Sequence, residues 1–258
     1  MPTASSAAAP RLAALLPLLA VLAASGCLAP SAAPPPDAHG EVVLIRGLFN
    51  VFSLGMDEIA DELNDDGYHA LSIAGSQRKA TGRKLIREAE EGTLARPLVI
   101  VGHSYGGDAA VRLTHQLDRA GVRVDKLILV DPTTPGRIPA NVDKVFDVYR
   151  SSPATDWVPV LRGVAVETES PETEVVNFDL RQSDDPELSS ATINHFNIDE
   201  ARAVQDLVIE QVHVIAGRAP EAAFTVHSDG PGDLPAHDEA SPPAGRDLTA
   251  EAEQDDDV

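Results

Sequence analysis

The stretch Pro97-Leu98-Val99-Ile100-Val101, followed at once by Gly102-His103-Ser104-Tyr105-Gly106-Gly107, decides the fold of this 258-residue chain. The apolar run predicts a buried strand, and residues 108–120, closed by Gly121, predict a helix directly after it. A tight turn from strand to helix strains the backbone of its central residue and leaves room only for glycine two residues before and two after. Ser104 is therefore a candidate nucleophile, with its hydroxyl exposed at the carboxyl edge of a sheet and at the positive end of the following helix.

Strand and helix patterns alternate on both sides of this turn, which is typical of an α/β domain with three layers and a mostly parallel central sheet. One segment, 132–173, is proline-punctuated and contains the only tryptophan, Trp157. We expect it to be irregular, either a minimal cap over the site or a long loop, with 163–167 as a further strand at most. The predicted strands are 41–47, 69–74, 97–101, 125–131 and 174–180, and the predicted helices are 53–63, 79–91, 108–120 and 199–216.

The N-terminus has the pattern of an export signal. Arg11 precedes an apolar run that is too short to span a hydrocarbon core of ~30 Å. The run ends in Ser25-Gly26-Cys27, and residues 22–27 resemble a bacterial lipobox, although Ala24 stands where a leucine is commonest. We expect 1–27 to be a signal peptide and Cys27 to be lipidated, which predicts an exported lipoprotein anchored in a membrane. Ordinary signal-peptidase cleavage that leaves a free thiol is the alternative.

Charge and composition set the remaining boundaries. Residues 28–39 are rich in proline and alanine and are expected to form a tether, and 40–217 are expected to form the folded domain. Residues 218–258 carry eleven acidic residues against two arginines, a net charge of −9, and are expected to be disordered. The whole chain has a formal net charge of −21, which argues against nucleic acid as a partner. A single cysteine excludes an intramolecular disulfide and any cysteine-rich metal site.

A serine nucleophile needs a base, and the base needs a carboxylate to orient it. When the serine lies on such a turn, the order along the chain is serine, acid, histidine. Among the eight histidines, only His195 lies in a loop between a late strand and the closing helix, within 193–199. It is our candidate base, and the alternative is a loop histidine that caps the last helix.

Two main candidates exist for the acid that orients the base. Asp131 follows the predicted strand next to the one that bears Ser104, and Pro132 turns the chain there. Asp179 ends the next predicted strand, but a polar loop follows it. We favour Asp131 and keep Asp179 open, with Asp184 or Asp185 as lesser alternatives.

When a serine attacks a carbonyl group, the carbonyl oxygen becomes negatively charged, and two backbone N–H groups are expected to hold this oxyanion. One belongs to Tyr105, which follows the nucleophile, and the other to the loop after the first strand. In that loop we choose Leu48, with Phe49 behind it, although the glycine before them is also compatible with simple strand termination. The sequence has no metal-binding or phosphate-binding motif, so neither a metal nor an organic cofactor is expected.

The elbow at 102–107 together with the Val-Asp-Lys-Leu-Ile-Leu-Val-Asp-Pro run at 124–132 resembles the α/β-hydrolase superfamily, and within it the thioesterase domains of fatty-acid and polyketide synthesis. The resemblance covers roughly 40–216, and it departs from the family at Arg46, where a histidine is usual, and in the short cap region. It implies an α/β-hydrolase fold and acyl transfer to water through an acyl-enzyme, with small-molecule or lipid esters as substrates. An acyltransferase or haloperoxidase-like relative and a non-catalytic ligand-binding lipoprotein are the alternatives.

Overall fold

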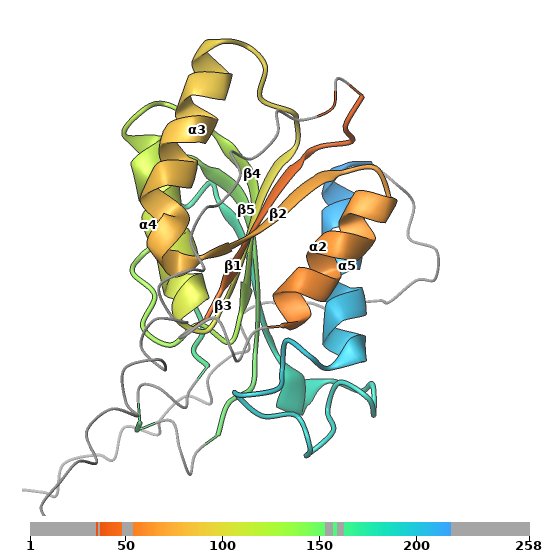
Figure 1. The fold of residues 1–258 in the computed structure, drawn as a ribbon. Helices are drawn as coiled ribbons and strands as arrows, with labels where there is room; N and C mark the ends of the chain where they lie inside the picture. The colour runs from red at the N-terminus through yellow and green to blue at the C-terminus, as the bar shows by residue number, and fades with distance from the viewer. Residues whose placement is uncertain (1–34, 36, 48–53, 153–156, 159–162, 218–258) are drawn as a thin grey trace, which may run out of the picture. The chain divides into compact units, whose positions relative to one another are not determined.

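A computed structural model describes residues 35, 37–47, 54–152, 157–158 and 163–217 of the chain. They form a six-stranded sheet in the order β2-β1-β3-β4-β5-β6, in which all neighbouring strands are parallel (Figure 1). The three-layer α/β fold expected from the sequence is confirmed. The strands are β1 Glu41–Arg46, β2 His69–Ala74, β3 Leu98–His103, β4 Val124–Val130, β5 Val142–Tyr149 and β6 Glu174–Asp179.

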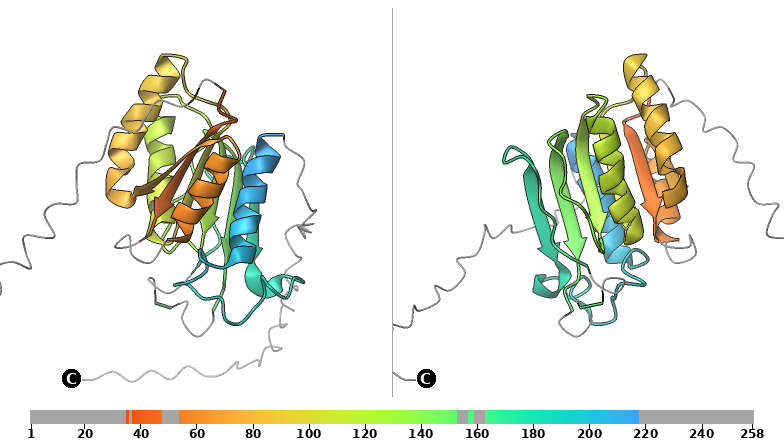
Figure 2. Two further views of the ribbon diagram at one scale, coloured as in Figure 1. Left: turned by 45° about the vertical axis from the view of Figure 1, so that its right-hand side comes forward. Right: turned by 90° about the vertical axis from the view of Figure 1, so that its left-hand side faces the viewer.

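Helices cover both faces of the sheet. Helices α3 (Arg78–Glu90) and α4 (Tyr105–Asp118) lie on one face, and α2 (Gly55–Asp65) and α5 (Arg202–Ile215) lie on the other (Figures 1 and 2). The central strands are therefore buried on both sides, and the apolar runs 42–45 and 98–101 are completely inaccessible to solvent. Continuous apolar sequence rather than alternation is what such strands require.

The direction of the winding reverses between β1 and β3. The chain passes from β1 to the edge strand β2 and then returns to the other side of β1 to form β3. The helices that follow β1 and β3 lie on opposite faces, and sites in open parallel sheets form at the carboxyl ends of strands at such a switch point. Ser104 directly follows β3, so the fold puts it there.

Strand β5 corrects the prediction for 132–173, because this segment contributes a whole strand to the sheet rather than only a cap or loop. Charged residues at positions 143, 144 and 147 interrupt its apolar pattern, so the sequence did not predict this strand. The segment 163–167 forms no strand, and a single bridge joins Ile138 to Thr168. The described part of 132–173 contains no helix. Buried Ile138 and Val166 belong instead to the core cluster that contains α4 residues.

Element boundaries differ by a few residues from the expected ones. Helix α4 begins at Tyr105 rather than at 108, and α5 begins at Arg202 rather than at 199. The signal peptide, Cys27, the acidic tail, Leu48 and Phe49 lie outside the described residues. Within the ranges that the structure describes, no helix has the length and apolar character needed to cross a membrane.

Candidate active site

The backbone at Ser104 has the strained conformation that the glycine pattern predicts. Its φ is 56° and its ψ is −128°, and it stands at the N-cap of α4. A Cβ atom on Gly106 would lie 2.1 Å from the carbonyl oxygen of Ile45, and one on Gly102 would lie 2.5 Å from the carbonyl oxygen of Gly106. Larger residues at either position would force the turn apart, so the two glycines are what allow the serine its position.

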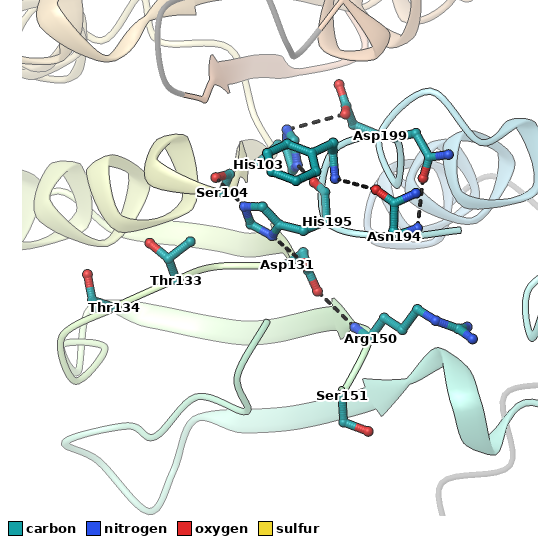
Figure 3. A network of polar contacts seen from close by, with 12 residues as sticks. His103, Ser104, Asp131, Thr133, Thr134, Arg150, Ser151, Asn194, His195 and Asp199 are labelled. Carbon is teal, nitrogen blue, oxygen red and sulfur yellow. Dashed lines mark hydrogen bonds and ion pairs between the residues drawn. The ribbon is translucent and has the colours of Figure 1, made fainter. Parts of the chain in front are cut away.

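Three segments far apart in the sequence bring Ser104, His195 and Asp131 together (Figure 3). Ser104 Oγ lies 2.9 Å from His195 Nε2, and His195 Nδ1 lies 2.5 Å from Asp131 Oδ2. An aspartate at Nδ1 fixes the tautomer that carries its proton there, which leaves the Nε2 lone pair free to accept the serine proton. The base and the favoured acid of the sequence prediction thus meet the candidate nucleophile in a single hydrogen-bonded chain.

Asp131 is held by its surroundings in the orientation that serves His195. Its backbone is itself strained, with a φ of 51°, and its N–H donates to the carbonyl of Val148 over 2.8 Å. The second carboxylate oxygen, Oδ1, accepts the backbone N–H of Arg150 over 2.8 Å. A Cβ atom on Gly163 would lie only 1.8 Å from Oδ1. Because Gly163 has no side chain, it leaves room for the carboxylate. No local sequence pattern predicted this role.

Two of the three alternative acids, Asp179 and Asp185, have other partners. Asp179 accepts hydrogen bonds from the backbone N–H and the hydroxyl of Ser151, at 3.2 and 2.6 Å, and from the N–H of Arg181 at 3.0 Å. It therefore caps the short turn that follows β6. Asp185 accepts the backbone N–H of Glu187 over 2.8 Å within its own loop. Nδ1 of His195 faces Asp131 and not these residues.

Tyr105 supplies a backbone donor on the side of Ser104 where an oxyanion would form. Tyr105 is the first residue of α4, so its N–H is one of the four that a helix leaves without an internal acceptor. It lies at the positive end of the helix, where a developing negative charge is stabilised. Leu48, the expected second donor, lies outside the described residues. The guanidinium of Arg46 pairs with Asp57 in the first turn of α2, with Nη1 3.1 Å from Oδ2.

A buried aspartate on α4 fixes the chain just beyond Asp131. Asp108 accepts hydrogen bonds from the Thr133 hydroxyl at 2.9 Å, the Thr134 N–H at 3.0 Å and the Thr134 hydroxyl at 2.9 Å. The carboxylate also lies in the first turn of α4, where the helix dipole favours negative charge. The turn that carries the nucleophile and the turn that carries the acid are thereby joined.

Two further ionisable groups lie buried beside Ser104, His195 and Asp131, the three residues that we call the triad. Burial lowers the pKa of His103 to about 3, and the charge of His195 acts in the same direction. Burial raises the pKa of Asp147 on β5 well above its ordinary value, and the charge of Asp131 adds to this shift. Within the described part of the chain, neither carboxylate oxygen of Asp147 has a hydrogen-bond partner. The described residues contain no group of three or more His, Cys, Asp or Glu side chains arranged to hold a metal ion.

Searches for relatives found similarity only among solved structures. No family model matches the chain, and no curated protein matches it. A putative hydrolase of the α/β superfamily from Xanthomonas campestris pv. campestris is 16% identical, with 68% of this chain and 99% of that chain covered at a TM-score of 0.36. The RedJ thioesterase from the prodiginine pathway of Streptomyces coelicolor is 12% identical over 74% of this chain and 96% of its own, at a TM-score of 0.38.

A third solved structure, Aspergillus fumigatus lipase B, is 12% identical, with 69% of this chain and 56% of that chain covered at a TM-score of 0.41. Similarity at these levels carries no functional weight.

Proposed function

We propose that this protein is a serine hydrolase that cleaves carboxylic esters or thioesters through an acyl-enzyme on Ser104. The observation that carries the proposal is the hydrogen-bonded chain from Ser104 Oγ to His195 Nε2, at 2.9 Å, and from His195 Nδ1 to Asp131, at 2.5 Å. A serine hydroxyl is a weak nucleophile until a positioned base takes its proton. The strained turn, the base and the orienting acid supply the parts that this chemistry needs.

In the first half-reaction His195 Nε2 removes the proton of Ser104 as Oγ attacks the carbonyl carbon of the substrate. The tetrahedral intermediate collapses when the protonated His195 passes that proton to the departing alkoxide or thiolate, which leaves an acyl-enzyme. Water, deprotonated by the same nitrogen, then attacks the acyl carbon, and Ser104 regains its proton as the acid is released. Asp131 stabilises the imidazolium that forms in each half-reaction.

The negative charge of each tetrahedral intermediate would be held by backbone N–H groups. Tyr105 is proposed as one donor because its N–H lies at the N-terminus of α4 beside the nucleophile. Leu48 is proposed as the second. Losing one such donor typically costs about 100–1000-fold in turnover.

The proposal extends to where the protein acts. A lipid on Cys27 would anchor the exported chain to a membrane, with residues 28–39 as the tether. We propose lipid esters or short-chain esters as the substrate classes, because an enzyme anchored at a membrane would encounter them there. No nucleic-acid partner is proposed, because a chain with a net charge of −21 repels polyanions.

Steady-state turnover of a panel of p-nitrophenyl esters and acyl-CoA thioesters tests the proposal. We expect measurable hydrolysis by the wild type and a loss of several orders of magnitude in both Ser104→Ala and His195→Ala, with the fold retained by circular dichroism. Product analysis with added alcohol distinguishes water from another acyl acceptor. Undiminished turnover in Ser104→Ala would show that Ser104 is not the nucleophile and would refute the proposal.

A further inference from the structure

His103, the residue inside the elbow just before the nucleophile, makes contacts that the triad does not require. Its side chain is 3% exposed and lies between the loop that bears His195 and the start of α5 (Figure 3). Nε2 of the ring is 3.2 Å from the backbone carbonyl oxygen of His195. Nδ1 is 3.3 Å from Oδ1 of Asp199, a carboxyl whose side chain is completely buried.

The contact with the carbonyl of His195 defines where the proton of the His103 ring lies. A carbonyl oxygen only accepts, so Nε2 of His103 must carry the hydrogen that it shares with His195. Burial lowers the pKa of His103 to about 3, so the ring is neutral at physiological pH and Nδ1 presents a lone pair. Oδ1 of Asp199 lies 3.3 Å from this nitrogen without forming a hydrogen bond, and within the described residues neither carboxyl oxygen of Asp199 has a hydrogen-bond partner.

The environment of Asp199 disfavours its charged form. Burial raises the pKa of Asp199 to about 7, and the carboxylates of Glu200 and Glu58 act in the same direction. The backbone N–H groups of Asp199 itself and of Gly55 oppose this rise. Asp199 is therefore mostly protonated below pH 7 and mostly ionised above it, whereas His103 stays neutral on both sides of this pH.

Asp199 is itself rigidly supported. A Cβ atom on Gly55 would lie 1.9 Å from the carbonyl oxygen of Asp199, so α2 packs directly against it. The side-chain amide of Gln205 donates to the same carbonyl at 3.1 Å and to Glu58 Oε2 at 2.7 Å. Helices α2 and α5 thus fix the position from which Asp199 contacts His103.

We propose that His103, backed by Asp199, is a positioning residue that ties the backbone of His195 to the nucleophile elbow. Asp131 and Ser104 hold only the imidazole of His195. Buried Ile193 and Ile198 anchor the two ends of its loop, but Asn194 and Phe196, directly beside it, are exposed. The ring of His103 holds the main chain of that loop from the interior. Through its hydrogen bond to the His195 carbonyl, His103 sets the distance between Ser104 and His195. This inference rests on the proposed function.

The tautomer of His103 provides a test that needs no activity. Long-range ¹H–¹⁵N spectra of the full chain labelled with ¹⁵N-histidine, assigned with a His103 variant, report which ring nitrogen is protonated. We expect His103 to be neutral at pH 6–8 with its proton on Nε2. A proton on Nδ1 alone, or a charged ring, would overturn the proposed bond to His195.

Kinetics of three variants test the role itself. His103→Phe keeps a ring of similar size without a donor, and His103→Gln retains an amide N–H near the position of Nε2–H. His115→Phe is the matched control, because Nε2 of His115, near the C-terminal end of α4, also contacts a backbone carbonyl, that of Arg137 at 2.9 Å. The readouts are kcat, KM and the rate of fluorophosphonate labelling.

We expect His103→Phe to lower kcat and the labelling rate by about 100-fold, the cost of misplacing a catalytic group by about 1 Å, with KM little changed. His103→Gln should recover most of this loss, and His115→Phe should match the wild type. Equal losses in Phe and Gln, or a wild-type kcat in His103→Phe, would overturn the positioning role. A wild type that neither labels nor turns over esters would instead refute the proposed function, while the tautomer measurement would still decide the contact.

Discussion

Replacing Asp131 with asparagine is expected to abolish nearly all activity without unfolding the protein, for a reason that the geometry makes specific. Oδ1 of Asp131 accepts the Arg150 backbone N–H at 2.8 Å, and that donor requires an oxygen. In Asp131→Asn the amide oxygen therefore stays at this position, and the amide NH₂ takes the place of Oδ2 beside His195. Nδ1 of His195 must then accept rather than donate, so its proton moves to Nε2 and the lone pair that serves Ser104 is lost.

The loss has two components that act together: the wrong tautomer and the missing carboxylate opposite the imidazolium. The equivalent change in serine proteases costs about 10⁴-fold in kcat, which corresponds to about 5.4 kcal/mol of transition-state stabilisation. The bond to Arg150 survives in the variant, so we expect little change in the free energy of unfolding.

The assay is kcat for the best ester of the panel, combined with ¹⁵N spectra that report the tautomer of His195. We expect the proton on Nδ1 in the wild type and on Nε2 in Asp131→Asn. Asp179→Asn is the control, because Asp179 bonds Ser151 and Arg181 and not the base, and it should keep most activity. A kcat within tenfold of wild type in Asp131→Asn, or the opposite ranking of the two variants, would refute this reasoning.

Three further predictions concern other parts of the chain. Because burial raises the pKa of Asp147, the folded protein keeps a proton that the unfolded chain releases above about pH 4, so stability is lost as pH rises. Asp147→Asn should therefore raise the urea midpoint at pH 7 more than at pH 4, and equal shifts would speak against a protonated Asp147. Gly163→Ala places a Cβ atom 1.8 Å from Asp131 Oδ1, so kcat should fall about 100-fold; a wild-type kcat would show that the carboxylate tolerates displacement. Cys27→Ser should release the protein from the membrane fraction or leave its precursor unprocessed, and unchanged fractionation and processing would count against the lipid anchor.

The parts of the site that the sequence predicted are those with a local pattern or a fixed order along the chain. Ser104 was recognisable because a glycine pattern, an apolar strand and a helix surround it. His195 and Asp131 followed from the order of nucleophile, acid and base, and from their places after predicted strands. The structure places Ser104 and Asp131 each within hydrogen-bonding distance of a different ring nitrogen of His195.

What escaped prediction depends on contacts between distant segments. Strand β5 was hidden because a charged residue, Asp147, is buried in its interior, and an apolar pattern is the main signal for a buried strand. Missing β5 also placed Asp179 one strand too close to the site. The bond between His103 and the carbonyl of His195 joins residues 92 positions apart, and Gly163 matters only because Asp131 folds against it.

Labelling with a fluorophosphonate probe, followed by mass spectrometry of the intact protein and of its peptides, tests the central claim most directly. The wild type should gain a single adduct, the modified peptide should carry it on Ser104, and ester turnover should fall in proportion to labelling. Ser104→Ala should remain unlabelled while its circular dichroism matches the wild type. An adduct on a different serine, or a correctly folded wild type that does not react at all, would contradict the assignment of Ser104 as the nucleophile.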